Sequence, residues 1–89
     1  MTYQTLLYYC YSHIADAEQF AADHLKFCKS LDLVGRIIVA DEGLNGTVSG
    51  TPEACEAYMK AIHADERFAK TEFKIDEVDE LSFLKMHCR

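Results

Sequence analysis

The sequence predicts a small α+β domain with the element order β-α-β-β-α-β. Three observations support this fold class: four short apolar strand patterns, two helical patterns that each begin at a capping residue, and turn residues between the two middle strands. The 89 residues, 49% of them apolar, suffice for one thin core. We therefore expect an antiparallel sheet that carries both helices on one face.

The first strand is expected over residues 5–11 and has apolar side chains on both of its faces. In an extended segment, alternate residues share a face. Such a strand is typical of the centre of a sheet, where both faces are covered. The two sets of side chains are Leu6, Tyr8 and Cys10 on one face, and Leu7, Tyr9 and Tyr11 on the other.

Both helices have recognisable first residues. Asp16 is the expected N-cap of the first helix, and Gln19 completes a capping-box-like pair three residues later. Thr51 as N-cap and Pro52 at the first helical position begin the second helix. Apolar residues at three- and four-residue spacing give each helix one buried side. These are Ala17, Phe20, Ala21, His24, Phe27, Cys28 and Leu31 in the first helix, and Cys55, Tyr58, Met59 and Ile62 in the second.

The two middle strands are expected at residues 37–40 and 46–50, joined by an acidic, glycine-containing turn. Asn45 and Gly46 are suited to the positive φ angles of a tight hairpin turn. A fourth strand at residues 72–76 alternates apolar and polar side chains. This order of elements is that of a ferredoxin-like domain, with both helices on the same side of the sheet.

One face of the expected sheet has no cover from within this chain. An aromatic face of the first strand would then be exposed, which is unusual unless a partner docks there, so Tyr8, Tyr9 and Tyr11 are candidate docking residues. Residues 81–89 alternate in polarity and stop without a polar tail, which favours a piece of a longer protein. We place the domain at residues 1–80 and the start of a connection at residues 81–89.

Composition narrows the function classes. A net charge of −6 weighs against a free-standing nucleic-acid binder. No apolar run approaches the roughly 20 residues of a membrane span, and the N-terminus lacks the basic region of a signal peptide, so we expect a cytoplasmic protein. The cysteines are expected to stay reduced in that compartment. They are Cys10, Cys28, Cys55 and Cys88.

The most specific segment is GRIIVADEGLNGTVSG, residues 35–50. It resembles the N-terminal domain of the bacterial rhodanese-containing tRNA uridine hydroxylases, which 5-hydroxylate the wobble uridine of tRNA. The aromatic first strand and the closing FLKMHCR also fit this family, so the resemblance spans essentially the whole chain. The matching positions in the segment are Gly35, Arg36, Ala40, Glu42, Gly43, Leu44, Asn45, Gly46, Thr47, Val48 and Ser49.

The resemblance implies an acylphosphatase-like domain that precedes a rhodanese domain, whose loop cysteine is the catalytic residue. None of the four cysteines here matches that residue, so we expect this chain to be catalytically silent and to hold no cofactor. The implied parent is an oxygen-dependent oxidoreductase. Its rhodanese domain and tRNA are the implied partners.

The hairpin segment supplies the binding or interface candidates, and two interpretations stay open. Turn conformation explains the glycines and the asparagine, a loop cap explains Glu42, and a nearby carboxylate would pair with Arg36. Alternatively, Arg36, Glu42 and Asn45 face the rhodanese domain or the RNA, since arginine holds phosphate and asparagine reads base edges. The full candidate set is Arg36, Glu42, Gly43, Asn45, Gly46 and Thr47.

Three other functions agree less well with the sequence. Cys10 and His13 are chemically suitable metal ligands, but they form a CxxH without a second pair at zinc-finger spacing, so we expect no metal. An independent RNA-binding domain would use the strand tyrosines, yet the third strand offers only Thr47, Val48 and Ser49 in place of aromatic residues. For acylphosphatase activity, the sequence lacks the required glycine- and arginine-containing loop after the first strand, and a shared fold alone does not transfer chemistry.

Overall fold

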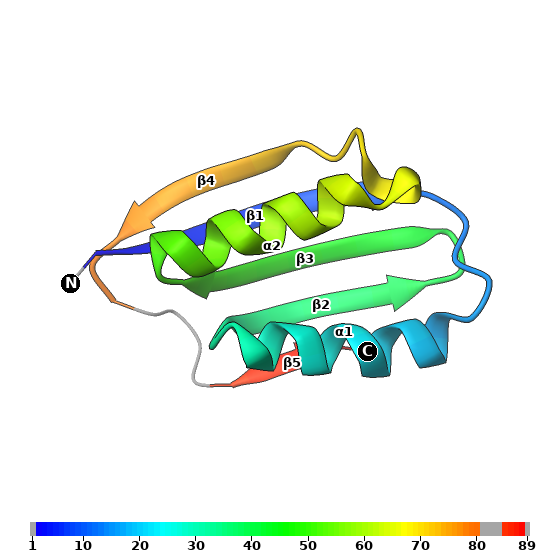
Figure 1. Cartoon of the computed structure of the whole chain (residues 1–89), viewed down its shortest axis with the longest axis horizontal. Helices are drawn as coiled ribbons and strands as arrows, with labels where there is room; N and C mark the ends of the chain where they lie inside the picture. Colours follow the sequence, from blue (N-terminus) through cyan, green and yellow to red (C-terminus); the bar gives the residue numbers. More distant parts are fainter. Residues whose placement is uncertain (1, 81–84, 89) are drawn as a thin grey trace.

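The structure, a computed structural model, describes residues 2–80 and 85–88. Two helices lie side by side over one face of a single sheet, and a short 3-10 turn follows the second helix (Figure 1). Neither helix has the length and apolarity of a membrane span in the described ranges. The elements are β1 (Tyr3–Tyr11), α1 (Ala17–Ser30), β2 (Val34–Ala40), β3 (Gly43–Gly50), α2 (Pro52–Ala64), η1 (Glu66–Phe68), β4 (Phe73–Val78) and β5 (Met86–Cys88).

The sheet has five strands in the order β4-β1-β3-β2-β5. β1 pairs antiparallel with β3 and β4, and β2 pairs antiparallel with β3, which confirms the expected βαββαβ arrangement. The sequence did not indicate β5, which adds to the outer edge of β2 in parallel and makes the sheet mixed (Figure 1). Residues 81–89 alternate in polarity, but a strand of three residues is too short for this pattern to distinguish it from a connecting segment.

The core lies between the helices and the face of β1 that carries Leu6 and Tyr8. The strand residues that share this face include Val48 of β3 and Ile37 of β2, both fully buried. The helices contribute the apolar sides that their spacing predicts, so the amphipathic pattern is confirmed in both. Their buried residues are Ala21, His24 and Cys28 in α1, and Cys55, Tyr58 and Ile62 in α2.

A hydrogen-bonded chain of polar side chains crosses this core. The Tyr58 hydroxyl lies 2.7 Å from Nε2 of His24 and also bonds the Tyr8 hydroxyl. Burial lowers the pKa of His24 to about 4, so the ring is neutral near pH 7. Burial likewise raises the pKa of both tyrosines, which keeps their hydroxyls protonated as donors. The three side chains therefore satisfy one another inside an otherwise apolar layer.

The N-terminus of α1 is capped as the sequence predicts. The backbone N–H of Gln19 donates to the Asp16 carboxylate at 3.1 Å. We expect Asp16→Ala to lower the free energy of unfolding by about 1 kcal/mol, because one N-terminal N–H loses its acceptor. Asp16→Asn keeps an acceptor oxygen and is the matched control. Urea titrations followed by circular dichroism measure both, and equal losses in the two variants would contradict a capping role.

The hairpin turn is displaced from its predicted position. Asp41 and Glu42 form the turn, whereas Asn45 and Gly46 lie within β3 and have no positive φ. The residue with the unusual backbone is Gly43, at φ 153°. A Cβ there would lie 2.0 Å from the carbonyl oxygen of Cys10 on β1. The prediction of an Asn45-Gly46 turn is therefore wrong. The backbones of β1 and β3 approach closely at Gly43, the first residue of β3, and this is the position that requires a glycine.

Candidate functional site

The side of the sheet opposite the helices is the open face. Directly paired residues of neighbouring strands project to the same side, so the strand register defines its rows. One row across the middle of the sheet joins β5, β2, β3, β1 and β4; its members are His87, Arg36, Thr47, Leu7 and Lys74. Two residues further along, the next row holds Ile38, Asn45 and Tyr9, and the row nearest the hairpin turn holds Ala40, Gly43 and Tyr11.

Large apolar side chains gather on the open face. Tyr9 is 53% exposed and Tyr11 73%, with Leu7 and Ile38 at 40% and 49%. The two tyrosine rings stand edge to face with centroids 4.7 Å apart, and the Tyr9 hydroxyl donates to that of Tyr11. This is the exposed aromatic face expected of β1.

Tyr8 does not belong to this surface. It projects to the helix side, is 5% exposed and bonds Tyr58. Its place among the docking candidates is corrected for this reason, because strand alternation puts it on the face opposite Tyr9. Gly46 pairs with Tyr8 and is buried, and a Cβ there would lie 2.7 Å from the Tyr8 ring. Gly46 therefore makes room for the core tyrosine and presents no side chain to a partner.

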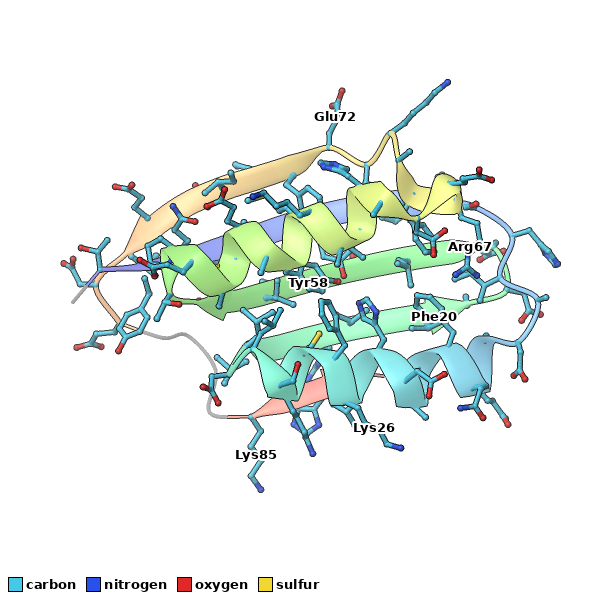
Figure 2. All side chains as sticks on the ribbon, in the orientation of Figure 1. Phe20, Lys26, Tyr58, Arg67, Glu72 and Lys85 are labelled. Carbon is cyan, nitrogen blue, oxygen red and sulfur yellow. The ribbon has the colours of Figure 1, made fainter. Side chains whose placement is uncertain are left out.

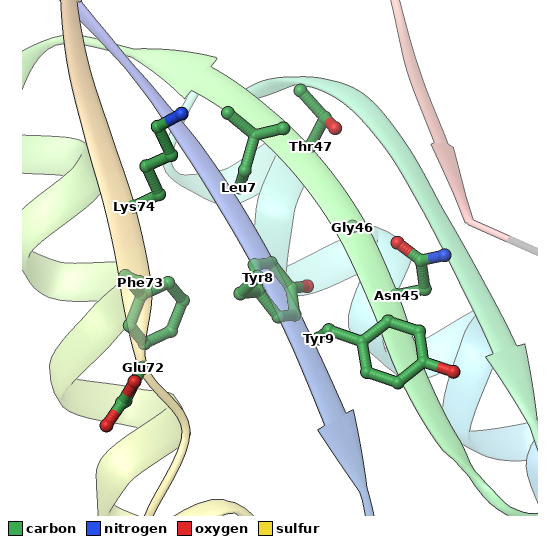
Figure 3. Close-up of a pocket in the computed structure, with 9 residues that line it drawn as sticks. All are labelled: Leu7, Tyr8, Tyr9, Asn45, Gly46, Thr47, Glu72, Phe73 and Lys74. Atoms are coloured by element: carbon green, nitrogen blue, oxygen red, sulfur yellow. The ribbon is translucent and has the colours of Figure 1, made fainter.

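Two hollows indent the open face on either side of Tyr9. The larger, the central hollow, has a volume of about 560 Å³ and opens widely to solvent (Figure 3). The smaller, the hairpin hollow, measures about 150 Å³. The open-face side chains that line the central hollow are Leu7, Tyr9, Asn45, Thr47, Glu72 and Lys74. Those of the hairpin hollow are Tyr9, Tyr11, Ile38, Ala40, Glu42 and Asn45.

The sequence candidates from the hairpin divide into two groups. The exposed residues Arg36, Glu42 and Asn45 reach the open face or its edge, and Thr47 is half-buried between Arg36 and Leu7. Gly43 and Gly46 are buried and have conformational or packing roles. In the described part of the chain, Arg36 forms no ion pair, so the expected pairing with a carboxylate is not seen there.

Sequence reasoning missed several residues of this face. Ile38, Leu7 and Lys74 were not among the binding candidates, although register places them beside Asn45, Thr47 and Tyr9. The available signal was strand alternation, which puts Ile38 with Arg36 and Leu7 with Tyr9. The pairing of distant strands then decides which of these residues become neighbours.

The arrangement of the described residues does not support the alternative of a metal site at Cys10 and His13. Across the described ranges, no three His, Cys, Asp or Glu side chains come together as a metal-binding group. Cys10 is half-buried on the helix side of β1, with its sulfur 3.9 Å from the Arg67 carbonyl oxygen, and His13 is exposed in the following loop. Burial raises the pKa of the Cys28 thiol to about 12 and that of Cys88 to about 11, so these thiols stay protonated near pH 7.

Comparison with known proteins identifies the family of this chain. Residues 3–89 match the UPF0176 acylphosphatase-like domain. The chain belongs to this family. The chain is also similar to proteins named tRNA uridine(34) hydroxylase: the one from Enterococcus faecalis is 61% identical over all 89 residues, and one from Staphylococcus aureus is 60% identical. The chain spans 28% of the length of these relatives.

Solved structures show the same acylphosphatase-like fold at low sequence identity. The BLUF domain structure titled BlrP1 BLUF superposes with a TM-score of 0.80 at 19% identity, covering 98% of this chain and 64% of that one. Acylphosphatase from Bacillus subtilis superposes with a TM-score of 0.65 at 13% identity, covering 100% of this chain and 99% of that one. At such identities the likeness extends to the fold and carries no chemistry.

Proposed function

We propose that this chain is the non-catalytic N-terminal domain of a tRNA wobble-uridine 5-hydroxylase. It packs against the rhodanese domain of its parent through the open face, and the hairpin end of that face borders the tRNA site. The observation that carries the proposal is the open face itself, which exposes four large apolar side chains with the polar side chains of Arg36 and Asn45 beside them. Relatives with the name tRNA uridine(34) hydroxylase, of whose length this chain spans 28%, support it.

The apolar centre of the open face is suited to a protein contact. Leu7 and Ile38 lie on either side of β3, at two neighbouring rows of the sheet, and both are close to half exposed. Exposed patches of this kind, rimmed by polar residues, mark interaction sites on folded domains. Arg36 and Asn45 lie beside them, so a domain that docks here brings its substrate near these two side chains.

A pair of isoleucines tests the docking. In the full-length protein, Ile38→Asp should weaken the contact between the domains, because it buries a carboxylate in the interface. Ile75→Asp is the control: Ile75 has nearly the same exposure, 47%, but lies on the opposite face at the β4 edge. Hydrogen exchange of β1 and β3 should rise in the first variant and not in the second. Equal exchange in both would contradict docking through the open face.

Activity tests the hairpin end separately. In the full-length protein, Arg36→Ala and Asn45→Ala should each lower uridine hydroxylation about tenfold, the cost of one lost charge-assisted or base-reading hydrogen bond. Lys26→Ala, which removes an exposed cation from α1 on the helix side, is the matched control (Figure 2). Circular dichroism should show folded protein in every case. Modification at the wild-type rate in both hairpin variants would overturn this role.

A further inference from the structure

The hairpin hollow combines flat aromatic rings with hydrogen-bonding groups. Tyr9 and Tyr11 form one wall, and the Asn45 amide and the Glu42 carboxylate complete the lining together with Ile38. Tyr9 and Asn45 are direct strand partners, and both project from the open face (Figure 3). We propose that this hollow holds one unstacked base of a single-stranded RNA segment. This inference rests on the proposed function, whose tRNA site it makes specific.

The dimensions of the hollow favour a single ring system. Its volume of about 150 Å³ is below the roughly 300–1,000 Å³ of sites that enclose drug-sized ligands. The Tyr9 side chain is about half exposed and that of Tyr11 nearly three-quarters, so both rings offer a free surface for stacking. Splayed-out RNA bases are recognised in this way, by an aromatic ring beneath and polar groups at the base edge.

The polar lining can bond the edge of a base. The Asn45 amide both donates and accepts hydrogen bonds, and the Glu42 side chain offers further acceptor oxygens. A base that presents a donor beside an acceptor matches this pair, since its N–H donates to a side-chain oxygen and its acceptor receives a hydrogen bond from the amide. Uracil and guanine present an imino N–H beside a keto oxygen, and adenine presents an amino group beside a ring nitrogen.

Cations lie where the flanking phosphates would be. Arg36 on β2 and Lys74 on β4 occupy the next row of the sheet, and the two rows are two residues, or about 7 Å, apart along the strands. Both side chains are exposed and form no ion pair with any residue in the described ranges. Although the whole chain carries a net charge of −6, the charged side chains of this row are Arg36 and Lys74, while the carboxylates of Glu42 and Glu72 line the adjoining hollows.

A titration of this chain with a uridine pentanucleotide tests the site. Backbone amide NMR signals of β1, β3 and the hairpin turn should shift, and Tyr9→Ala should weaken binding about fivefold or more through the lost stacking platform. Tyr9→Phe should bind like the wild type, because the ring remains. Between roughly 50 and 200 mM salt, two phosphate contacts predict about a sevenfold loss of affinity, and Arg36→Ala should reduce this dependence.

Loss of the base-edge hydrogen bonds is the second readout. Asn45→Ala should weaken binding of the uridine pentanucleotide about fivefold, while stacking keeps some affinity. Equal affinity of the wild type and Tyr9→Ala, or shifts confined to the helices, would overturn the site. So would absent binding of the oligonucleotide together with strong protection of Tyr9 and Asn45 in the full-length protein, which would make the hollow a protein interface and leave the docking proposal intact. Oligonucleotide binding with unchanged exchange in Ile38→Asp would support the base site and contradict the docking.

Discussion

Gly43→Ala is expected to destabilise the domain by about 4 kcal/mol. The backbone at Gly43 has a φ of 153°, a region that costs a non-glycine residue about 1–3 kcal/mol. The added methyl would also lie 2.0 Å from the Cys10 carbonyl oxygen and 3.0 Å from the Tyr11 Cα, so β1 and β3 would have to separate at the hairpin end. Overpacking of this kind adds about 1–3 kcal/mol. For a domain whose total stability is about 5–15 kcal/mol, the loss approaches unfolding.

Gly50→Ala adds the same methyl to the same strand and serves as the control. Gly50 lies outside the positive-φ region, and the closest atom to its Cβ is the Cδ2 of Leu33, the end of a side chain that can move. Its expected cost is about 1 kcal/mol. Urea titrations of both variants, followed by circular dichroism, give the comparison. A loss in Gly43→Ala no larger than that in Gly50→Ala would show that the hairpin accommodates a side chain.

The second large effect is a loss of stability in acid that originates at His24. Its pKa is about 4 in the folded protein and about 6.5 in the unfolded chain, because burial disfavours the imidazolium. A depressed folded-state pKa contributes stability that is complete above pH 6.5 and is lost as pH falls toward 4. By linkage, the loss amounts to about 2 kcal/mol at pH 5 and about 3 kcal/mol at pH 4.

His24→Gln isolates this contribution. Glutamine does not titrate in this range, yet its amide can still reach the Tyr58 hydroxyl, which lies 2.7 Å from Nε2 of His24. The free energy of unfolding is measured by urea titration from pH 7 to pH 4 in both proteins. The carboxylates are the same in both proteins, so their contribution cancels in the comparison. The difference in the free energy of unfolding between the wild type and His24→Gln should therefore shrink steadily from pH 7 to pH 4. Parallel pH profiles would show that His24 does not carry the acid sensitivity.

The local signals in the sequence predicted the helices well. A capping residue satisfies backbone donors within its own first turn, so Asp16 and Thr51 act without reference to the rest of the chain. Their hydrogen bonds to Gln19 and Ala54 are those that the patterns indicate. The order of the elements, and hence the fold class, follows from such signals together with strand alternation.

Signals that depend on strand pairing were less informative. β1 is apolar on both faces, so its sequence does not say whether Tyr8 or Tyr9 meets the helices. Asn45 has the composition of a turn residue but lies within β3, since Asp41 and Glu42 already close the hairpin. The contact of Tyr9 with Asn45 joins residues 36 positions apart, and only the register between β1 and β3 creates it. Most of the candidate site is of this non-local kind.

The two apolar faces of β1 also bear on how the strand finds its alignment during folding. A slip of one residue usually carries a penalty because it turns the apolar side of a strand toward water. In β1 such a slip would exchange one apolar set for another, so burial alone discriminates weakly between correct and shifted pairing. Two other features, one polar and one steric, specify the register between β1 and β3. At one end the Thr5 and Ser49 hydroxyls bond at 2.9 Å where both side chains are buried, and at the other the position opposite Tyr11 has room for glycine but not for a residue with a Cβ.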